Sequence, residues 1–163
     1  MSRTRSRNYP ALSLKEAIER ARAFYQKEGR AKVDAQSAVA AWGYSSLNGA
    51  SMRALAAVRQ YGLLEGSNED LRLTQRALTL LLEPATSPDY EAALGDALTS
   101  PALFAEVLAE YPEGLPSDAA LVSYLVRKQG FGDSAAKALA SSIRESLELK
   151  TPRDTNYAPR KRN

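Results

Sequence analysis

The stretch that decides the fold is residues 53–64, which read RALAAVRQYGLL. Leu55 and Val58 lie three residues apart, which is the spacing of apolar positions on one face of a helix. Gly62 follows them, and glycine is the residue type that most often stands just beyond a helix C-terminus. An apolar pair, a polar turn (GSNED) and the segment LRL come next. This pattern predicts a helix over residues 48–61 that leads directly into a short β-hairpin.

Helix start and stop signals divide the rest of the chain. Ser13 and Glu16 form a capping box, and apolar positions at helical spacing follow it up to Gly29. Asp34 is a suitable N-cap for a second helix that ends at Gly43. The composition agrees, because Ala and Leu total 50 residues against 15 Val, Ile and Thr, which predicts a mostly α fold. Further helices are expected over residues 75–82 and 88–99, from Ser100-Pro101 to 108, and over 117–129 and 133–149.

The absence of two residue types excludes several kinds of chemistry. The 163 residues contain no cysteine, which excludes disulfides, zinc–thiolate sites and cysteine nucleophiles. They also contain no histidine, the commonest general base and transition-metal ligand. Asp89 and the Glu148-Leu149-Lys150 segment superficially match a metal-nuclease pattern, but both segments are predicted to be helical. We therefore expect a protein that is not an enzyme and that binds neither a metal nor a cofactor.

Charge is distributed unevenly along the chain, although the net charge is only +3. Residues 1–64 hold eleven Lys and Arg against four acids, a net charge of +7. Residues 89–149 hold four Lys and Arg against ten acids (net −6), and residues 150–163 hold five against one (net +4). This asymmetry indicates a basic half that faces a polyanion and an acidic half that faces something else. The alternative is an ordinary mixed surface with solvated ends.

The order helix, helix, short turn, helix, hairpin over residues 13–74 resembles the winged helix-turn-helix domain. The end of that family's recognition helix has two apolar residues three apart, then glycine and an aliphatic pair, which Leu55, Val58, Gly62, Leu63 and Leu64 match. The resemblance extends to bacterial proteins that join a winged helix to a smaller helical domain. It implies a winged helix-turn-helix over residues 9–84 and a four-helix acidic subdomain over 85–149. The basic tails at 1–8 and 150–163 are almost without apolar residues and are expected to be disordered.

The resemblance implies that helix 48–61 enters the major groove of duplex DNA. The residue types at its start suit this role, because Asn pairs with adenine, Arg pairs with guanine and serine hydroxyls reach phosphates. Plain helix capping is the alternative for Ser45, Ser46 and Asn48, and a solvated side chain is the alternative for Arg53. Three acids at the hairpin tip argue against the wing as the main contact. The candidate DNA-binding residues are Ser45, Ser46, Asn48, Ser51, Met52 and Arg53, together with Arg30, Lys32, Arg72 and Arg76.

These observations favour a double-stranded DNA-binding protein, a transcriptional regulator of the cytoplasm and nucleoid with no membrane segment. With DNA on the basic half, residues 89–149 are the surface left for self-association, so a homodimer is expected. Residues 1–88 are expected to fold alone and to remain monomeric. The alternative function is a protein–protein interaction subunit that uses the winged helix as a scaffold in a larger assembly.

Overall fold

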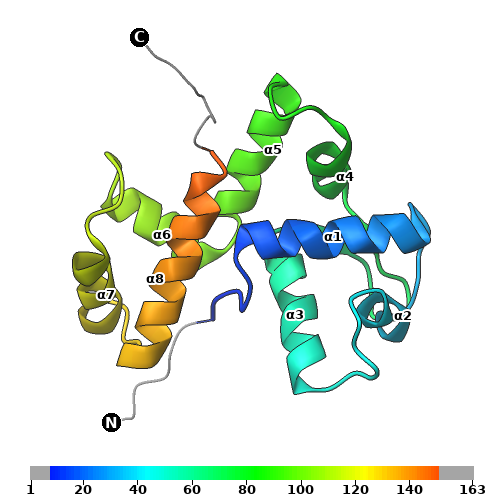
Figure 1. Ribbon diagram of the computed structural model, residues 1–163, viewed down its shortest axis with the longest axis horizontal. Coiled ribbons are helices and arrows are strands. Elements are labelled where there is room, and N and C mark those ends of the chain that lie inside the picture. Colours follow the sequence, from blue (N-terminus) through cyan, green and yellow to red (C-terminus); the bar gives the residue numbers. More distant parts are fainter. Residues whose placement is uncertain (1–7, 151–163) are drawn as a thin grey trace.

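The structure, a computed structural model, describes residues 8–150, so the expected disordered tails lie outside the described residues apart from Asn8 and Lys150. Within this range the protein is mostly helical with one small antiparallel sheet, which confirms the predicted mostly α class with a hairpin (Figure 1). The helices are α1 (Leu14–Glu28), α2 (Ala35–Ala40), α3 (Gly49–Gln60), α4 (Gln75–Leu82), α5 (Pro88–Thr99), α6 (Ala102–Glu110), α7 (Asp118–Arg127) and α8 (Asp133–Glu148). The strands are β1 (Leu64–Glu65) and β2 (Arg72–Leu73).

Most helices begin where the sequence provides a capping side chain. At the start of α1 the predicted capping box is present, since the Glu16 N–H donates to Ser13 Oγ (3.1 Å) and the Ser13 N–H donates to Glu16 Oε1 (2.9 Å). Asp34 caps α2, and the hydrogen bond that it accepts from the Ser37 N–H lowers the pKa of Asp34 below its ordinary value.

The start of α6 differs from the prediction. Ser100 was expected to cap this helix, but it instead closes α5 by donating its N–H to the Ala97 carbonyl. Pro101 occupies the N-cap position of α6 and provides no side-chain hydrogen bond. The reason is that α5 continues to Thr99, which makes Ser100 the C-cap of α5 rather than the N-cap of the next helix.

The stretch 53–64 folds as a helix followed by a strand. At the end of α3 the Leu63 N–H donates to the Val58 carbonyl (3.1 Å) and the Gly62 N–H donates to the Arg59 carbonyl (2.8 Å). This is a Schellman motif, which needs a left-handed residue, and Gly62 has φ +77°. The chain then enters β1, where Leu64 pairs with Leu73 of β2 and places both side chains in the core.

The hairpin is tied to the helices on both sides. Val33, between α1 and α2, exchanges hydrogen bonds with Leu71 (2.8 and 2.7 Å), so β2 lies between this residue and β1. Arg59 of α3 donates through Nη2 to the Gly66 carbonyl (2.5 Å), which holds the hairpin loop against α3. Gly66 has φ +102°, and a Cβ there would lie 2.0 Å from the Asp70 carbonyl oxygen, so only glycine fits.

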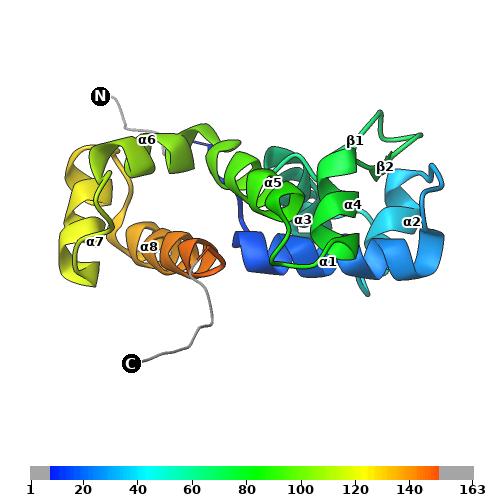
Figure 2. The same cartoon turned by 90° about the horizontal axis from the view of Figure 1, so that it is seen from above.

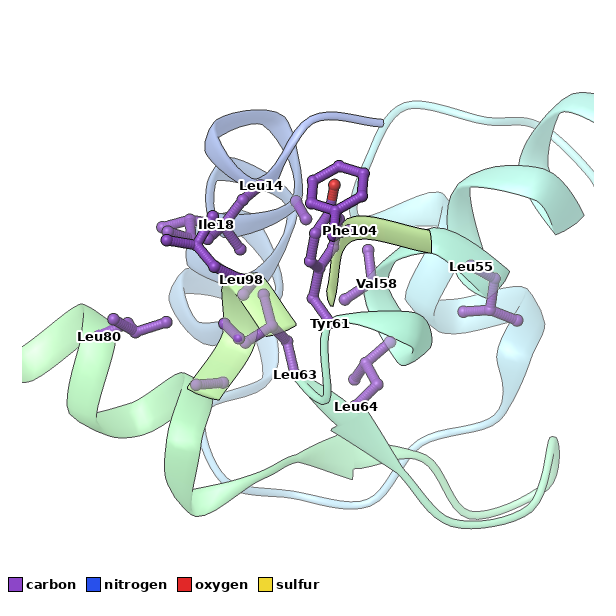
Figure 3. Packing of buried hydrophobic residues seen from close by; sticks show 14 of the residues in the cluster. Leu14, Ile18, Leu55, Val58, Tyr61, Leu63, Leu64, Leu80, Leu98 and Phe104 are labelled. Atoms are coloured by element: carbon purple, nitrogen blue, oxygen red, sulfur yellow. The ribbon is translucent and has the colours of Figure 1, made fainter. Parts of the chain in front are cut away.

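One hydrophobic core runs through both halves of the chain. Tyr61, fully buried at the end of α3, contacts Phe104 of α6 edge-to-face with ring centroids 5.7 Å apart (Figure 3). Burial raises the pKa of the Tyr61 hydroxyl, which stays protonated and donates to the Leu12 carbonyl (2.7 Å). Close by, the Leu14 N–H donates to Ser146 Oγ of α8 (2.9 Å), which joins the start of α1 to the end of the described chain.

The packing of side chains is continuous across the expected domain boundary between residues 84 and 85. Helices α4 and α5 contact each other across it, and buried residues from both sides form one cluster. In Figure 2, α5 lies between a group formed by α1–α4 and a group formed by α6–α8. Cutting the chain at residue 88 would separate Tyr61 from Phe104 and Leu14 from Ser146. The independent folding of residues 1–88 stays a prediction, and the contacts that cross residue 88 show which part of the core such a fragment would lose.

Candidate nucleic-acid interface

The turn between α2 and α3, residues 43–48, is held by both helices. From α2, Gln36 donates through Nε2 to the Ser45 carbonyl (3.3 Å). From α3, Ser51 donates through Oγ to the Ser46 carbonyl (2.9 Å). These bonds fix the start of α3 relative to α2, while the side chains of Ser45, Ser46 and Leu47 remain exposed. In Figure 1 this end of α3 lies at the lower edge of the view, away from α1.

Helix α3 has one buried and one exposed face, as its amphipathic pattern predicts. Its exposed stripe consists of Gly49, Met52, Arg53 and Ala56. These positions are three or four residues apart, except for the consecutive pair 52 and 53, so they share one face of the helix. The Arg53 guanidinium lies over the start of the helix. Its Nη1 is so close to Gly49 that a Cβ added to this glycine would be 3.2 Å away from it. The sequence has no acid from residue 35 to residue 64, so neither the turn nor the stripe carries a negative side chain.

Two predicted contact residues form the cap of α3. The Ser51 N–H donates to Asn48 Oδ1 (2.9 Å), and the Asn48 N–H donates to Ser51 Oγ (2.8 Å). Ser51 is fully buried, so its side chain cannot touch a nucleic acid, and the structure removes it from the candidate contacts. Asn48 stays exposed although it caps the helix. Capping, the alternative considered for these residue types, is therefore the role of both side chains.

The predicted cationic contacts lie in different places. Lys32 and Arg72 flank the Val33–Leu71 bridge and are both exposed, so they share the exposed face of the small sheet, and Arg30 is exposed two residues before Lys32. Arg72 is ion-paired with Glu65 (2.9 Å), its partner in the strand register, and both side chains are about half exposed.

Arg76 has a structural role. It is half-buried, and its Nη1 donates to the Tyr61 carbonyl (2.8 Å), against the turn at Gly62. Five of the predicted residues lie in the turn and the first turns of α3, namely Ser45, Ser46, Asn48, Met52 and Arg53. The cations Arg30, Lys32, Arg72 and Arg76 lie outside this segment.

Sequence reasoning missed two residues of this region. Leu47, in the turn, is 43% exposed, and with Met52 (38%) it makes up two of the three large hydrophobic side chains exposed within residues 8–150, the third being Leu82. A leucine inside the otherwise polar segment YSSLNG was a signal that could have revealed it. Arg59, which holds the hairpin loop, has no distinctive signal because a surface arginine on a helix is common.

Metal binding and membrane insertion have little support in the part of the chain that the structure describes. Among the described residues no group of three or more acidic side chains is arranged to hold a metal ion. No single helix in the same range is long and apolar enough to cross a membrane; α5 and α6 together satisfy length and composition alone, and they are bent by 98°. An open pocket between α7 and α8 is lined by both signs of charge, including Arg144, which is ion-paired with Asp118 (2.7 Å).

We compared the chain with known protein families, with curated proteins and with solved structures, and found no match in any of the three.

Proposed function

We propose that the protein is a non-enzymatic double-stranded DNA-binding protein that places α3 in the major groove. The observation that carries this proposal is the exposed stripe of α3, where Arg53 stands among small and apolar residues in a segment, 35–64, that contains no acid. A helix fits the major groove, and arginine pairs there with the O6 and N7 atoms of guanine. The positive end of the helix dipole lies at the same end of α3 and favours an approaching phosphate.

The order of elements supports a winged helix-turn-helix arrangement. Helices α2 and α3 are joined by a fixed turn, and the β1–β2 hairpin follows α3 directly. Glu65, Glu69 and Asp70 lie at the exposed end of this hairpin, and Arg59 holds its loop against α3. We therefore assign the main DNA contact to α3 and at most phosphate contacts to Lys32 and Arg72 on the exposed face of the sheet.

A homodimer through residues 89–149 has weaker support. These residues carry a net charge of −6, which would repel DNA and leaves them free for a partner. They expose none of the large hydrophobic side chains found on the described surface, so a dimer here would be held by polar contacts. Sedimentation of the full chain at micromolar concentration decides between a monomeric and a dimeric regulator.

The test of DNA binding is a fluorescence-polarisation titration of the full chain with labelled duplex of random sequence. The logarithm of the binding constant should fall with the logarithm of salt concentration, with a slope of about 0.9 per phosphate contact. Arg53→Ala should weaken binding. Arg22→Ala is the matched control, because it removes the same charge from a half-exposed position on α1, where Arg22 is paired only loosely with Glu19 (3.7 Å). Absence of binding to any duplex at low salt would contradict the proposal.

The exposed apolar residues favour a second candidate function. Leu47 and Met52 lie close in sequence at the turn and the first helical turn of α3, and exposed apolar patches often mark protein-binding surfaces. In this alternative, α3 docks onto a partner protein and the hairpin serves as a scaffold. The two functions differ in their first experiment, since the scaffold predicts no salt-dependent binding to duplex DNA.

A further inference from the structure

The exposed stripe of α3 has the composition of a surface that reads bases rather than one that only grips phosphates. Arg53 is its one charged residue within Gly49–Ala56, whereas phosphate binding depends on many cations. Met52 and Leu47 add two exposed apolar side chains, 38% and 43% exposed. The other exposed positions of this part of α3, at 49, 50 and 56, have at most a methyl group, so the backbone of the helix can come close to a partner.

The major groove contains one apolar group, the C5-methyl of thymine, and 5-methylcytosine presents a methyl at the same position of its ring. Apolar side chains recognise this methyl, and arginine recognises the guanine edge. Resting on the DNA-binding function proposed above, we propose that the α3 stripe recognises a pyrimidine C5-methyl group next to a guanine. Met52 and Leu47 contact the methyl, and Arg53 pairs with the guanine.

The arrangement of the side chains supports this pairing of contacts. Met52 and Arg53 are both on the exposed face of α3, so one partner that docks on this face can contact both, and neighbouring base pairs are only about 3.4 Å apart. The Arg53 guanidinium lies over Gly49, toward the turn that carries Leu47. An apolar contact and a guanidinium are therefore presented side by side, without an acidic side chain that would repel the DNA.

The test uses three duplexes of equal length and charge in polarisation titrations with the full chain. One strand repeats TG and the other CA in the first duplex. In the second duplex deoxyuridine replaces thymidine, which removes only the methyl. The third duplex keeps deoxyuridine and carries 5-methylcytosine in the CA strand. We expect the second duplex to bind about fourfold more weakly for each methyl contacted, from the transfer free energy of one buried carbon. Recovery with the third duplex extends the recognised chemistry to a 5-methylcytosine paired with the guanine, and its absence restricts recognition to a methyl at the thymine position beside the guanine.

Two variants assign the effect to the stripe. Replacing Met52 and Leu47 together by alanine should bring the thymidine-to-deoxyuridine affinity ratio close to one, while Leu82→Ala, which shortens the third exposed hydrophobic side chain, at the end of α4, should leave the ratio unchanged. A ratio of one in the wild type, with salt-dependent binding and the Arg53→Ala loss intact, overturns methyl recognition and leaves DNA binding standing. A ratio that persists when both Met52 and Leu47 are alanine also overturns it, because the difference then comes from DNA shape. Failure of all three duplexes to bind at low salt overturns the proposed function as well.

Discussion

Replacing Phe104 by alanine tests whether the two halves of the chain share one core. Phe104 is 1% exposed, and its ring packs edge-to-face on Tyr61, which belongs to the other half. Truncating a buried phenylalanine to alanine lowers the free energy of unfolding by about 3–5 kcal/mol, because contacts are lost and a cavity remains. With a urea m-value of roughly 2 kcal/mol/M, the unfolding midpoint should fall by roughly 1.5–2.5 M.

The assay compares two probes of the same urea titration. Trp42 is the single tryptophan of the chain, and its indole Nε1 donates to the Arg20 carbonyl (2.7 Å), so its fluorescence reports on α1 and the end of α2. Far-UV circular dichroism reports on all the helices. If one core joins the two halves, both probes should give the same lowered midpoint in Phe104→Ala, although Trp42 lies in the half without the substitution.

A Trp42 transition that stays at the wild-type midpoint while the dichroism transition moves would refute the shared core. Leu82→Ala is the control, since this side chain is 48% exposed and its loss should change the free energy of unfolding by less than about 0.5 kcal/mol. If Phe104→Ala does not fold at all, Phe104→Leu should cost less than about 1.5 kcal/mol and can be measured by the same two probes.

Four further expectations concern stability. Gly66→Ala should lower the free energy of unfolding by more than about 1 kcal/mol in urea titrations, because the added Cβ meets backbone in a left-handed turn; a neutral result contradicts the loop geometry. Tyr61→Phe should cost about 0.5–1.5 kcal/mol by leaving the Leu12 carbonyl without its donor, and no change would exclude that bond. The pKa of Asp34 is lower in the folded protein than in the unfolded chain, where it is about 3.9. The cap therefore stabilises the protein above the unfolded pKa, and this stabilisation is lost as the pH falls through the folded pKa. Asp34→Asn should remove this contribution to the pH dependence of the free energy of unfolding. A chain ending at residue 88 should lack a cooperative transition and bind a hydrophobic dye, whereas a sharp transition would restore the independent domain.

The helix ends and the hairpin were predictable because they depend on neighbours in sequence. Ser13 and Glu16 cap α1 from three residues apart, and Gly62 ends α3 within one turn of Val58. The contacts between the two halves of the chain were not predictable in the same way. An apolar stripe shows that a helix is covered on one side, but it does not show which distant helix covers it, so the packing of α8 on α1 could not be predicted.

In the candidate site, too, some features could be predicted from the sequence and others could not. The exposure of Met52 and Arg53 follows from helical periodicity, which also places Leu55 and Val58 inside. The burial of Ser51 depends on how the preceding turn folds over the helix start, which periodicity does not encode. The cations were the hardest to assign, because an arginine that binds a backbone carbonyl, as Arg76 does, has the same sequence appearance as one that binds phosphate.

The hydrogen bond between Leu14 and Ser146 joins residues 132 positions apart. Ribosomes add about 5–20 residues per second, so about 7–26 s pass between the synthesis of these two residues. Throughout that time the nascent chain holds the first helix without the last one, and the part of α1 that α8 covers is open to chaperones and to other nascent chains. The protein therefore completes its core only after α8 has left the ribosomal exit tunnel, and its yield in cells should depend on how well the incomplete chain is protected until then.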